Sequence, residues 1–192
     1  MRNDFLYTDY IIDLFNQIEL AYSNKFSIFD AITKDDLIFA FFPCVRFTRR
    51  MIFNFVRTGA GNKKFNDIEK LEQNIRYFNE MNYFYSIISK LVIVCLRKEL
   101  KLIIENPYHK DHILSQFWHI KPKVIHTDRT LFGDTLKKPI QYFFIGLEPK
   151  QNVLFEPLTA KPCNIVSNLS KIERSLISSE YSYRFIKTYI ID

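Results

Sequence analysis

A continuous apolar run at residues 37–42 constrains the fold of this chain more than any other feature of its sequence. The run follows the charged residues Lys34, Asp35 and Asp36 and ends at Pro43. It is too short for a typical helix, and it lacks the alternation of a strand that has one solvated face. The run therefore predicts a strand buried on both faces, as in the sheet of an α/β protein.

Periodic patterns along the rest of the chain predict further helices and strands. Apolar residues recur at helical spacing in residues 11–22, 68–98, 111–117 and 178–190, with a possible break near 79–82. Short apolar runs predict strands at residues 101–105, 124–126 and 141–147. The order strand, helix, strand over residues 37–105 predicts a βαβ unit, and no linker divides residues 1–192, so we expect a single domain.

Several classes of protein do not fit the composition. No apolar run reaches the ~20 residues of a membrane span, and the first ten residues do not resemble a signal peptide. The three cysteines, Cys44, Cys95 and Cys163, lack the spacing of a disulfide framework or a zinc site. His109 and His112 have no acidic partner pattern, so we interpret them as solvated. We expect a cytoplasmic protein with no metal site and no membrane contact.

Positive charge is concentrated in one segment. Residues 1–36 are acidic, whereas residues 45–65 hold six basic side chains and no acidic one: Arg46, Arg49, Arg50, Arg57, Lys63 and Lys64. Phenylalanines alternate with these cations, a mixture that suits phosphate neutralisation and base stacking. A solvated loop anchored by its phenylalanines would have the same composition. We interpret residues 45–65 as a basic-aromatic loop that contacts nucleic acid.

Two reactive side chains follow the first two predicted strands. Cys44 comes directly after Pro43, and Glu105 with Asn106 and Pro107 ends the next strand. Open α/β sheets bind their ligands at the carboxyl ends of the strands. Either residue alone has a simpler explanation, because a cysteine after an apolar strand is more often an inert core residue. Together, in this order on one βαβ unit, they predict a site.

These motifs resemble those of the DNA cytosine-5 methyltransferases, including small phage and mobile-element relatives. Phe42-Pro43-Cys44 is similar to the family's Pro-Cys motif, and Glu105-Asn106 is similar to its Glu-Asn motif. The segment from Arg174 to Glu180 is similar to its carboxyl-terminal arginine segment, and Asp128-Arg129 is the nearest match to its base-contacting arginine motif. The resemblance implies an incomplete methyltransferase-like (Rossmann-like) fold, with flanking helices, a mostly parallel sheet and one antiparallel strand near residues 141–147.

The resemblance also implies a chemistry for each residue. A Cys44 thiolate would add to C6 of cytosine, helped by the positive charge of the nearby arginines, while Glu105 would hold the Watson–Crick edge of a flipped base. Pro43, Asn106, Pro107, Arg129 and Arg174 would help to bind that base.

The sequence departs from the family at the cofactor motif. Asp13-Leu14-Phe15 matches the first letters of the motif that holds S-adenosylmethionine, but no glycine follows them, and we interpret the match as coincidence within a helix. Methyl transfer would then need a missing cofactor-binding segment, upstream or on a partner subunit. The alternative is an inactive module that binds DNA or a protein.

Overall fold

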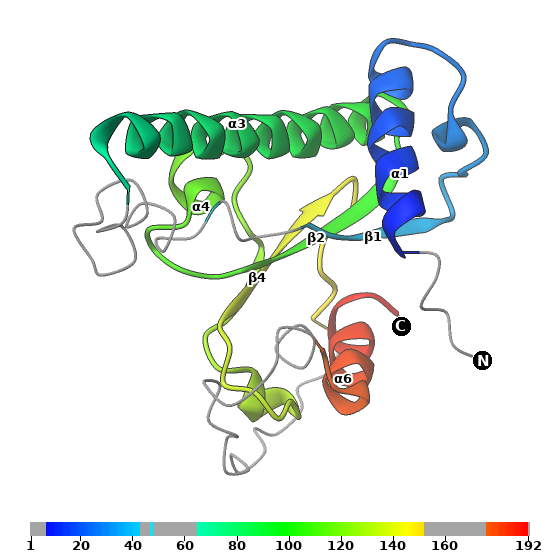
Figure 1. The fold of residues 1–192 in the computed structure, drawn as a ribbon. Helices are drawn as coiled ribbons and strands as arrows, with labels where there is room; N and C mark the ends of the chain where they lie inside the picture. Colours follow the sequence, from blue (N-terminus) through cyan, green and yellow to red (C-terminus); the bar gives the residue numbers. More distant parts are fainter. Residues whose placement is uncertain (1–6, 43–46, 48–64, 152–175, 192) are drawn as a thin grey trace.

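The computed structural model describes residues 7–42, 47, 65–151 and 176–191. They form a mixed α/β fold built on a four-stranded sheet with helices on both faces (Figure 1). The strands are β1 (Leu37–Phe41), β2 (Lys101–Pro107), β3 (Val124–His126) and β4 (Ile140–Ile145). The helices are α1 (Tyr7–Tyr22), α3 (Asp67–Arg97), α4 (Ile113–Phe117) and α6 (Ser179–Tyr189), with 3₁₀ turns at η1 (Ile28–Asp30) and η3 (Arg129–Phe132).

Three of the four described strands run in one direction. β1 pairs with β2 in parallel, with Leu37 opposite Lys101 and Phe41 opposite Glu105. β4 lies between β2 and β3 and is antiparallel to both. The predicted antiparallel strand is thus confirmed. Because β4 separates β2 from β3, only one of the three described strand pairs is parallel, although β1, β2 and β3 share a direction.

β1 differs from its prediction. It is the edge strand of the described sheet, its first four residues are half-buried, and the Phe41 side chain is 56% exposed. The strands buried along their length are β2 and β4, at the centre of the sheet. A run of apolar residues indicates that a strand can be buried on both faces, but its neighbours in the sheet decide whether it is.

Helices α1, α3 and α4 cover one face of the sheet. The larger core lies there, where Leu91, Val92 and Cys95 of α3 pack against Leu102 and Ile104 of β2. α3 is continuous, without the break allowed near residues 79–82, and Asn66 caps its start by accepting a hydrogen bond from the Glu69 N–H. No helix in the described part of the chain is both long enough and apolar enough to cross a membrane.

Helix α6 covers the opposite face (Figure 1). Tyr181 and Phe185 on this helix pack against Ile103 of β2 and against Tyr142 and Phe144 of β4. The Ser178 hydroxyl caps the helix by accepting a hydrogen bond from the Tyr181 N–H. The central strands are therefore covered on both faces.

Candidate functional site

The carboxyl ends of β1 and β2 lie side by side, as the two strand-end motifs require. Of the predicted site residues, the structure describes Glu105, Asn106, Pro107 and Arg129. The others lie outside the described residues: Pro43, Cys44, Arg46, Arg49, Arg50, Arg57, Lys63, Lys64 and Arg174. Their roles stay predictions.

Glu105 is a nearly buried carboxyl group on the α6 face of the sheet. It is 8% exposed and lies opposite Phe41 of β1 and Tyr142 of β4. Burial raises the pKa of its side chain, and the positive charges of Lys138 and Arg129 partly oppose that rise. Among the described residues, none forms a hydrogen bond or ion pair with this carboxyl. Glu105 is therefore a nearly buried carboxyl group with raised proton affinity near the end of β2.

Asn106 occupies the opposite face, because side chains alternate along a strand. It is fully buried, and neither its amide nitrogen nor its amide oxygen has a hydrogen-bond partner in the described part of the chain. Across the strand pair it lies opposite Gln141, whose amide accepts a hydrogen bond from the Ser115 hydroxyl (3.0 Å) and donates one to the Pro107 carbonyl (3.0 Å). An unpartnered amide in the core is costly, so it marks a polar position next to the strand end.

His112, which we interpreted as solvated, is completely buried, and that interpretation is wrong. Its two ring nitrogens have no hydrogen-bond partner among the described residues, and burial lowers its pKa to about 4. Its ring packs edge-on against Phe47, with centroids 5.9 Å apart, and the Phe47 carbonyl accepts a hydrogen bond from the Ile113 N–H (3.1 Å). The sequence carries no signal for this contact, because the two residues are 65 positions apart.

Arg129 is buried and already has partners. Its Nε donates a hydrogen bond to Asp134 (2.7 Å), its Nη2 pairs with the same carboxylate, and Nη2 also donates to the Leu176 carbonyl (3.0 Å). The guanidinium carbon lies 5.3 Å from the centroid of the Tyr181 ring. These contacts join the turn after β3 to the start of α6. Arg129 also supplies positive charge near Glu105.

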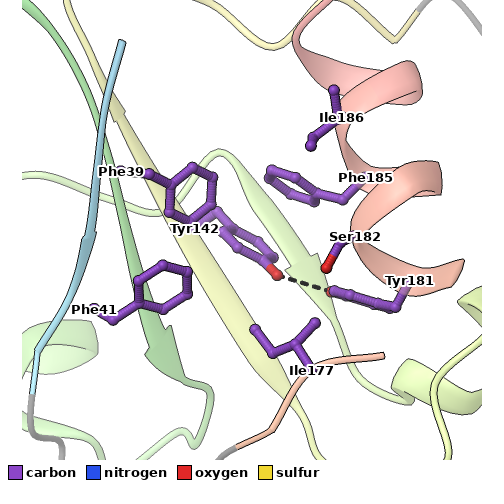
Figure 2. Close-up of a pocket in the computed structure, with 8 residues that line it drawn as sticks. All are labelled: Phe39, Phe41, Tyr142, Ile177, Tyr181, Ser182, Phe185 and Ile186. Carbon is purple, nitrogen blue, oxygen red and sulfur yellow. Dashed lines mark hydrogen bonds between the residues drawn. The ribbon is translucent and has the colours of Figure 1, made fainter. Parts of the chain in front are cut away.

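An aromatic pocket opens between β1 and α6 on the Glu105 face. Its cavity volume is about 150 Å³, and its walls are Phe39, Phe41, Tyr142, Ile177, Tyr181, Ser182, Phe185 and Ile186 (Figure 2). The Tyr142 and Tyr181 hydroxyls are hydrogen-bonded to each other at 3.0 Å. Sequence reasoning missed this pocket, because it is formed by residues from three separate elements.

A buried histidine continues this hydrogen-bonded chain away from the pocket. His126 Nδ1 lies 2.7 Å from the Tyr181 hydroxyl, and Nε2 lies 3.0 Å from the Tyr189 hydroxyl. The His126 ring is stacked on Phe132 with centroids 3.9 Å apart, and burial lowers its pKa to about 4. The network therefore contains a neutral histidine that fixes α6 on the sheet.

No group of three or more histidine, cysteine or acidic side chains in the described residues could hold a metal ion. Comparison of the chain with protein families, with curated proteins and with solved structures found no match. The function must therefore be argued from the site itself.

Proposed function

We propose that the chain is the base-reacting part of a DNA cytosine-5 methyltransferase-like enzyme, with Cys44 as nucleophile and Glu105 as the carboxyl group that holds the base. The observation that carries this proposal is the parallel register of β1 and β2, which sets Phe41 opposite Glu105. Cys44 follows Phe41 by three residues, a length of chain that spans at most ~11 Å.

Two buried phenylalanines flank Cys44 in the sequence. Phe42 and Phe47 both belong to the core cluster that contains Ile104 of β2 and Leu114 of α4. Cys44 is two residues from the first and three from the second, and each residue spans at most ~3.6 Å. The residues that flank Cys44 are thus held in the core on the α3 face of the sheet, the face opposite to Glu105.

The strand directions support the proposal. Three strands in one direction, with a fourth running against them, agree with an incomplete methyltransferase-like (Rossmann-like) sheet. β1 and β2 also place their carboxyl ends together, where such sheets bind ligands. Under this proposal the basic-aromatic loop, residues 45–65, contacts DNA around the flipped cytosine.

The cysteine and the carboxyl group suffice for the first chemical step. The thiolate forms a bond to C6 of cytosine, the electrons of the C5–C6 double bond shift to form a C4–C5 double bond, and those of the C4–N3 double bond take a proton at N3 from the protonated Glu105. This proton returns to the Glu105 carboxylate when the thiolate leaves. C5 is then nucleophilic and can take a proton from water. Loss of the original C5 hydrogen and expulsion of the thiolate restore cytosine, so this step exchanges hydrogen at C5.

The described residues do not fit the methyl donor. Residues 7–42 contain no glycine, so no glycine-rich turn lets the backbone approach S-adenosylmethionine closely. S-adenosylmethionine, when bound, would supply an electrophilic methyl group. We propose that a further segment or a partner subunit holds it, and that the chain alone binds it weakly or not at all.

Hydrogen exchange at C5 tests the proposal without the donor. The chain would be incubated with single- and double-stranded DNA carrying tritium at C5 of cytosine, and tritium released to water would be counted. We expect slow release that Cys44→Ser and Glu105→Gln each reduce at least 100-fold. Cys95→Ser is the matched control, because Cys95 is buried in the core and burial raises its pKa to about 12.

The same experiment distinguishes the proposed enzyme from the alternative, an inactive module that binds DNA or a protein. The glycine-free residues 7–42 and the basic loop also suit an inactive DNA-binding module. DNA binding without tritium release, or release that Cys44→Ser leaves unchanged, would refute the reacting role and favour that module. Absence of both release and DNA binding would favour a protein-interaction role.

A further inference from the structure

The cavity between β1 and α6 has the size of one aromatic ring. Its volume is about 150 Å³, and an apolar cavity of about that volume can hold a single benzene molecule. Protein cores are close-packed and contain few voids larger than a water molecule. A hollow of this size between a sheet and the helix that covers it therefore indicates a binding site for a small molecule.

The walls of the cavity suit an aromatic ring better than a saturated one. The rings of Phe39 and Phe41 are stacked, with centroids 5.0 Å apart. Phe39 also meets the rings of Phe185 and Tyr142 edge-on, with centroids 5.9 and 6.3 Å apart (Figure 2). Aromatic rings attract one another in both arrangements at such distances, and a saturated ring forms neither. A planar ring in the cavity would extend this aromatic cluster.

One side of the cavity carries hydroxyl groups. The hydroxyls of Tyr142 and Tyr181 are hydrogen-bonded to each other, and the Ser182 hydroxyl lies beside them (Figure 2). Ser182 donates its hydrogen to the Ser178 carbonyl (3.0 Å), and Tyr181 also bonds to His126. Among the described residues, Tyr142 bonds through its hydroxyl to Tyr181 alone. The Tyr142 hydroxyl therefore retains capacity for a hydrogen bond to a ligand.

The direction of these hydrogen bonds indicates which polar group the ligand needs. A neutral His126 ring has one donor and one acceptor nitrogen, so its tautomer decides whether Tyr181 donates to His126 or accepts from it. In the first case Tyr142 donates to Tyr181 and offers the ligand an acceptor. In the second case Tyr142 accepts from Tyr181 and offers the ligand a donor. A hydroxyl group on the ligand can both donate and accept, so it fits either tautomer.

The charges around the cavity favour a neutral ligand. None of the lining residues that the structure describes is charged. The Glu105 carboxyl lies on the same face of the sheet, on the strand between those of Phe41 and Tyr142, and when ionised it would repel an anion. Burial raises the pKa of Glu105, which limits the charge that it offers to a cation. The nearby cation Arg129 is already paired with Asp134.

We propose that this cavity binds a small neutral phenol, a single aromatic ring with a hydroxyl group. The ring packs against Phe39 and Phe185, and the hydroxyl forms a hydrogen bond with Tyr142. The ligand enters beside Phe41 and Ile186, lining residues that are 56% and 41% exposed. The proposal involves neither the nucleophile nor DNA, so it can fail or succeed independently of the methyltransferase-like function.

Titration of the full chain with three ligands, followed by NMR of its ¹⁵N-labelled amides, tests the proposal. Phenol should bind with a Kd of about 0.1–1 mM and shift the amide signals of β1 and α6. Toluene has the aromatic ring without the hydroxyl, and cyclohexanol has the hydroxyl without the aromatic ring. Each of them should bind about ten-fold more weakly than phenol.

Two pairs of variants test the contacts. Tyr142→Phe should weaken phenol binding about ten-fold and leave toluene binding unchanged, because it removes only a hydroxyl. Its control is Tyr189→Phe, since the Tyr189 hydroxyl bonds to His126 outside the cavity, and phenol affinity should stay within about two-fold. Phe41→Ala should weaken both ligands about three-fold or more, because it removes part of a wall. Its control is Phe26→Ala, at a side chain that is 87% exposed and outside the cavity, and neither affinity should change.

Five results would overturn the proposal. Equal affinities for phenol and toluene, or no effect of Tyr142→Phe, would show that the ligand hydroxyl is not recognised. Cyclohexanol binding as tightly as phenol would show that ring pairing is not involved. A dispersed spectrum whose β1 and α6 signals do not move at about 10 mM phenol would refute the site itself. Tighter binding of N-acetyltyrosinamide than of phenol would assign the cavity to a tyrosine side chain of a partner protein.

Discussion

Desolvation shifts the pKa values of the buried side chains Glu105, His112 and His126. A change of pH alters the stability contributed by the carboxyl group and by the two histidines in opposite directions. Burial raises the pKa of Glu105, and it lowers the pKa of His112 and of His126 to about 4. Only His126 has hydrogen-bond partners for both ring nitrogens. Glu105 and His112 are thus buried without a hydrogen bond from another described side chain or backbone group. Perturbed ionisable groups of this kind are frequent at functional sites.

The two buried histidines predict that the protein loses stability as the pH falls below about 6.5. Each neutral histidine in the folded chain binds fewer protons than in the unfolded chain, so the free energy of unfolding falls as pH drops from about 6.5 toward 4. Each contributes at most about 3 kcal/mol to that fall. His112→Leu should flatten the slope, and at pH 7 it should cost little, because neither ring nitrogen loses a described hydrogen bond.

Urea denaturation between pH 4 and 7.5 measures this effect. The control is His119→Leu, since His119 is exposed and should not alter the pH dependence. An unchanged slope in His112→Leu would show that His112 is not buried as a neutral ring.

At the scale of the elements, local pattern predicted most helices and strands but not their neighbours. The bounds of β3, α4 and α6 agree with the sequence because their turns and caps are local. The edge position of β1 depends on which strand pairs with it, and the burial of His112 depends on Phe47 from another segment. Such contacts between distant positions leave no periodic signal, so sequence alone could suggest Glu105 as a site but not its surroundings.

The buried ion pair between Arg129 and Asp134 joins two elements, and it gives a second prediction. Asp134→Ala should lower the free energy of unfolding by about 3–5 kcal/mol, because it leaves the guanidinium buried without its carboxylate. The double variant Arg129→Met with Asp134→Leu should lose less than the single variant, since no charge stays behind. Lys34→Ala, at the exposed pair with Glu99, should cost less than about 1 kcal/mol.

Thermal and urea unfolding of these four proteins provide the comparison. If Asp134→Ala has a free energy of unfolding as high as that of the double variant, the ion pair is not desolvated. In that case Arg129 would be free to contact a ligand, as the family resemblance suggests.

At the scale of the whole molecule, charge is separated along the chain. The acidic residues 1–36 precede the basic-aromatic loop with its six cations. The net charge of +6 therefore does not show that positive charge is concentrated in that loop. If Arg46, Arg49 and Arg50 each contact a phosphate, their joint replacement by glutamine should reduce the salt slope of DNA binding by roughly 2.7. Fluorescence anisotropy with a labelled duplex between 50 and 200 mM salt measures that slope.

A control variant that loses three positive charges elsewhere in the chain distinguishes phosphate contacts of the loop from an effect of net charge. Lys25 and Lys34 precede β1 in the chain and Lys98 precedes β2, all outside the basic-aromatic loop. Their replacement by glutamine should leave the slope within about one unit of the natural chain. Equal effects of the two triple variants would show that the basic loop has no special role.

The position of β4 between β2 and β3 determines when the sheet can close during protein synthesis. β2 is complete at residue 107, whereas the strand that fills its second edge begins at residue 140. Until those later residues leave the ribosome, a strand destined for the centre of the sheet has one edge without its partner. Such edges pair readily with other chains, so the nascent protein passes through a stage at which chaperone binding competes with aggregation.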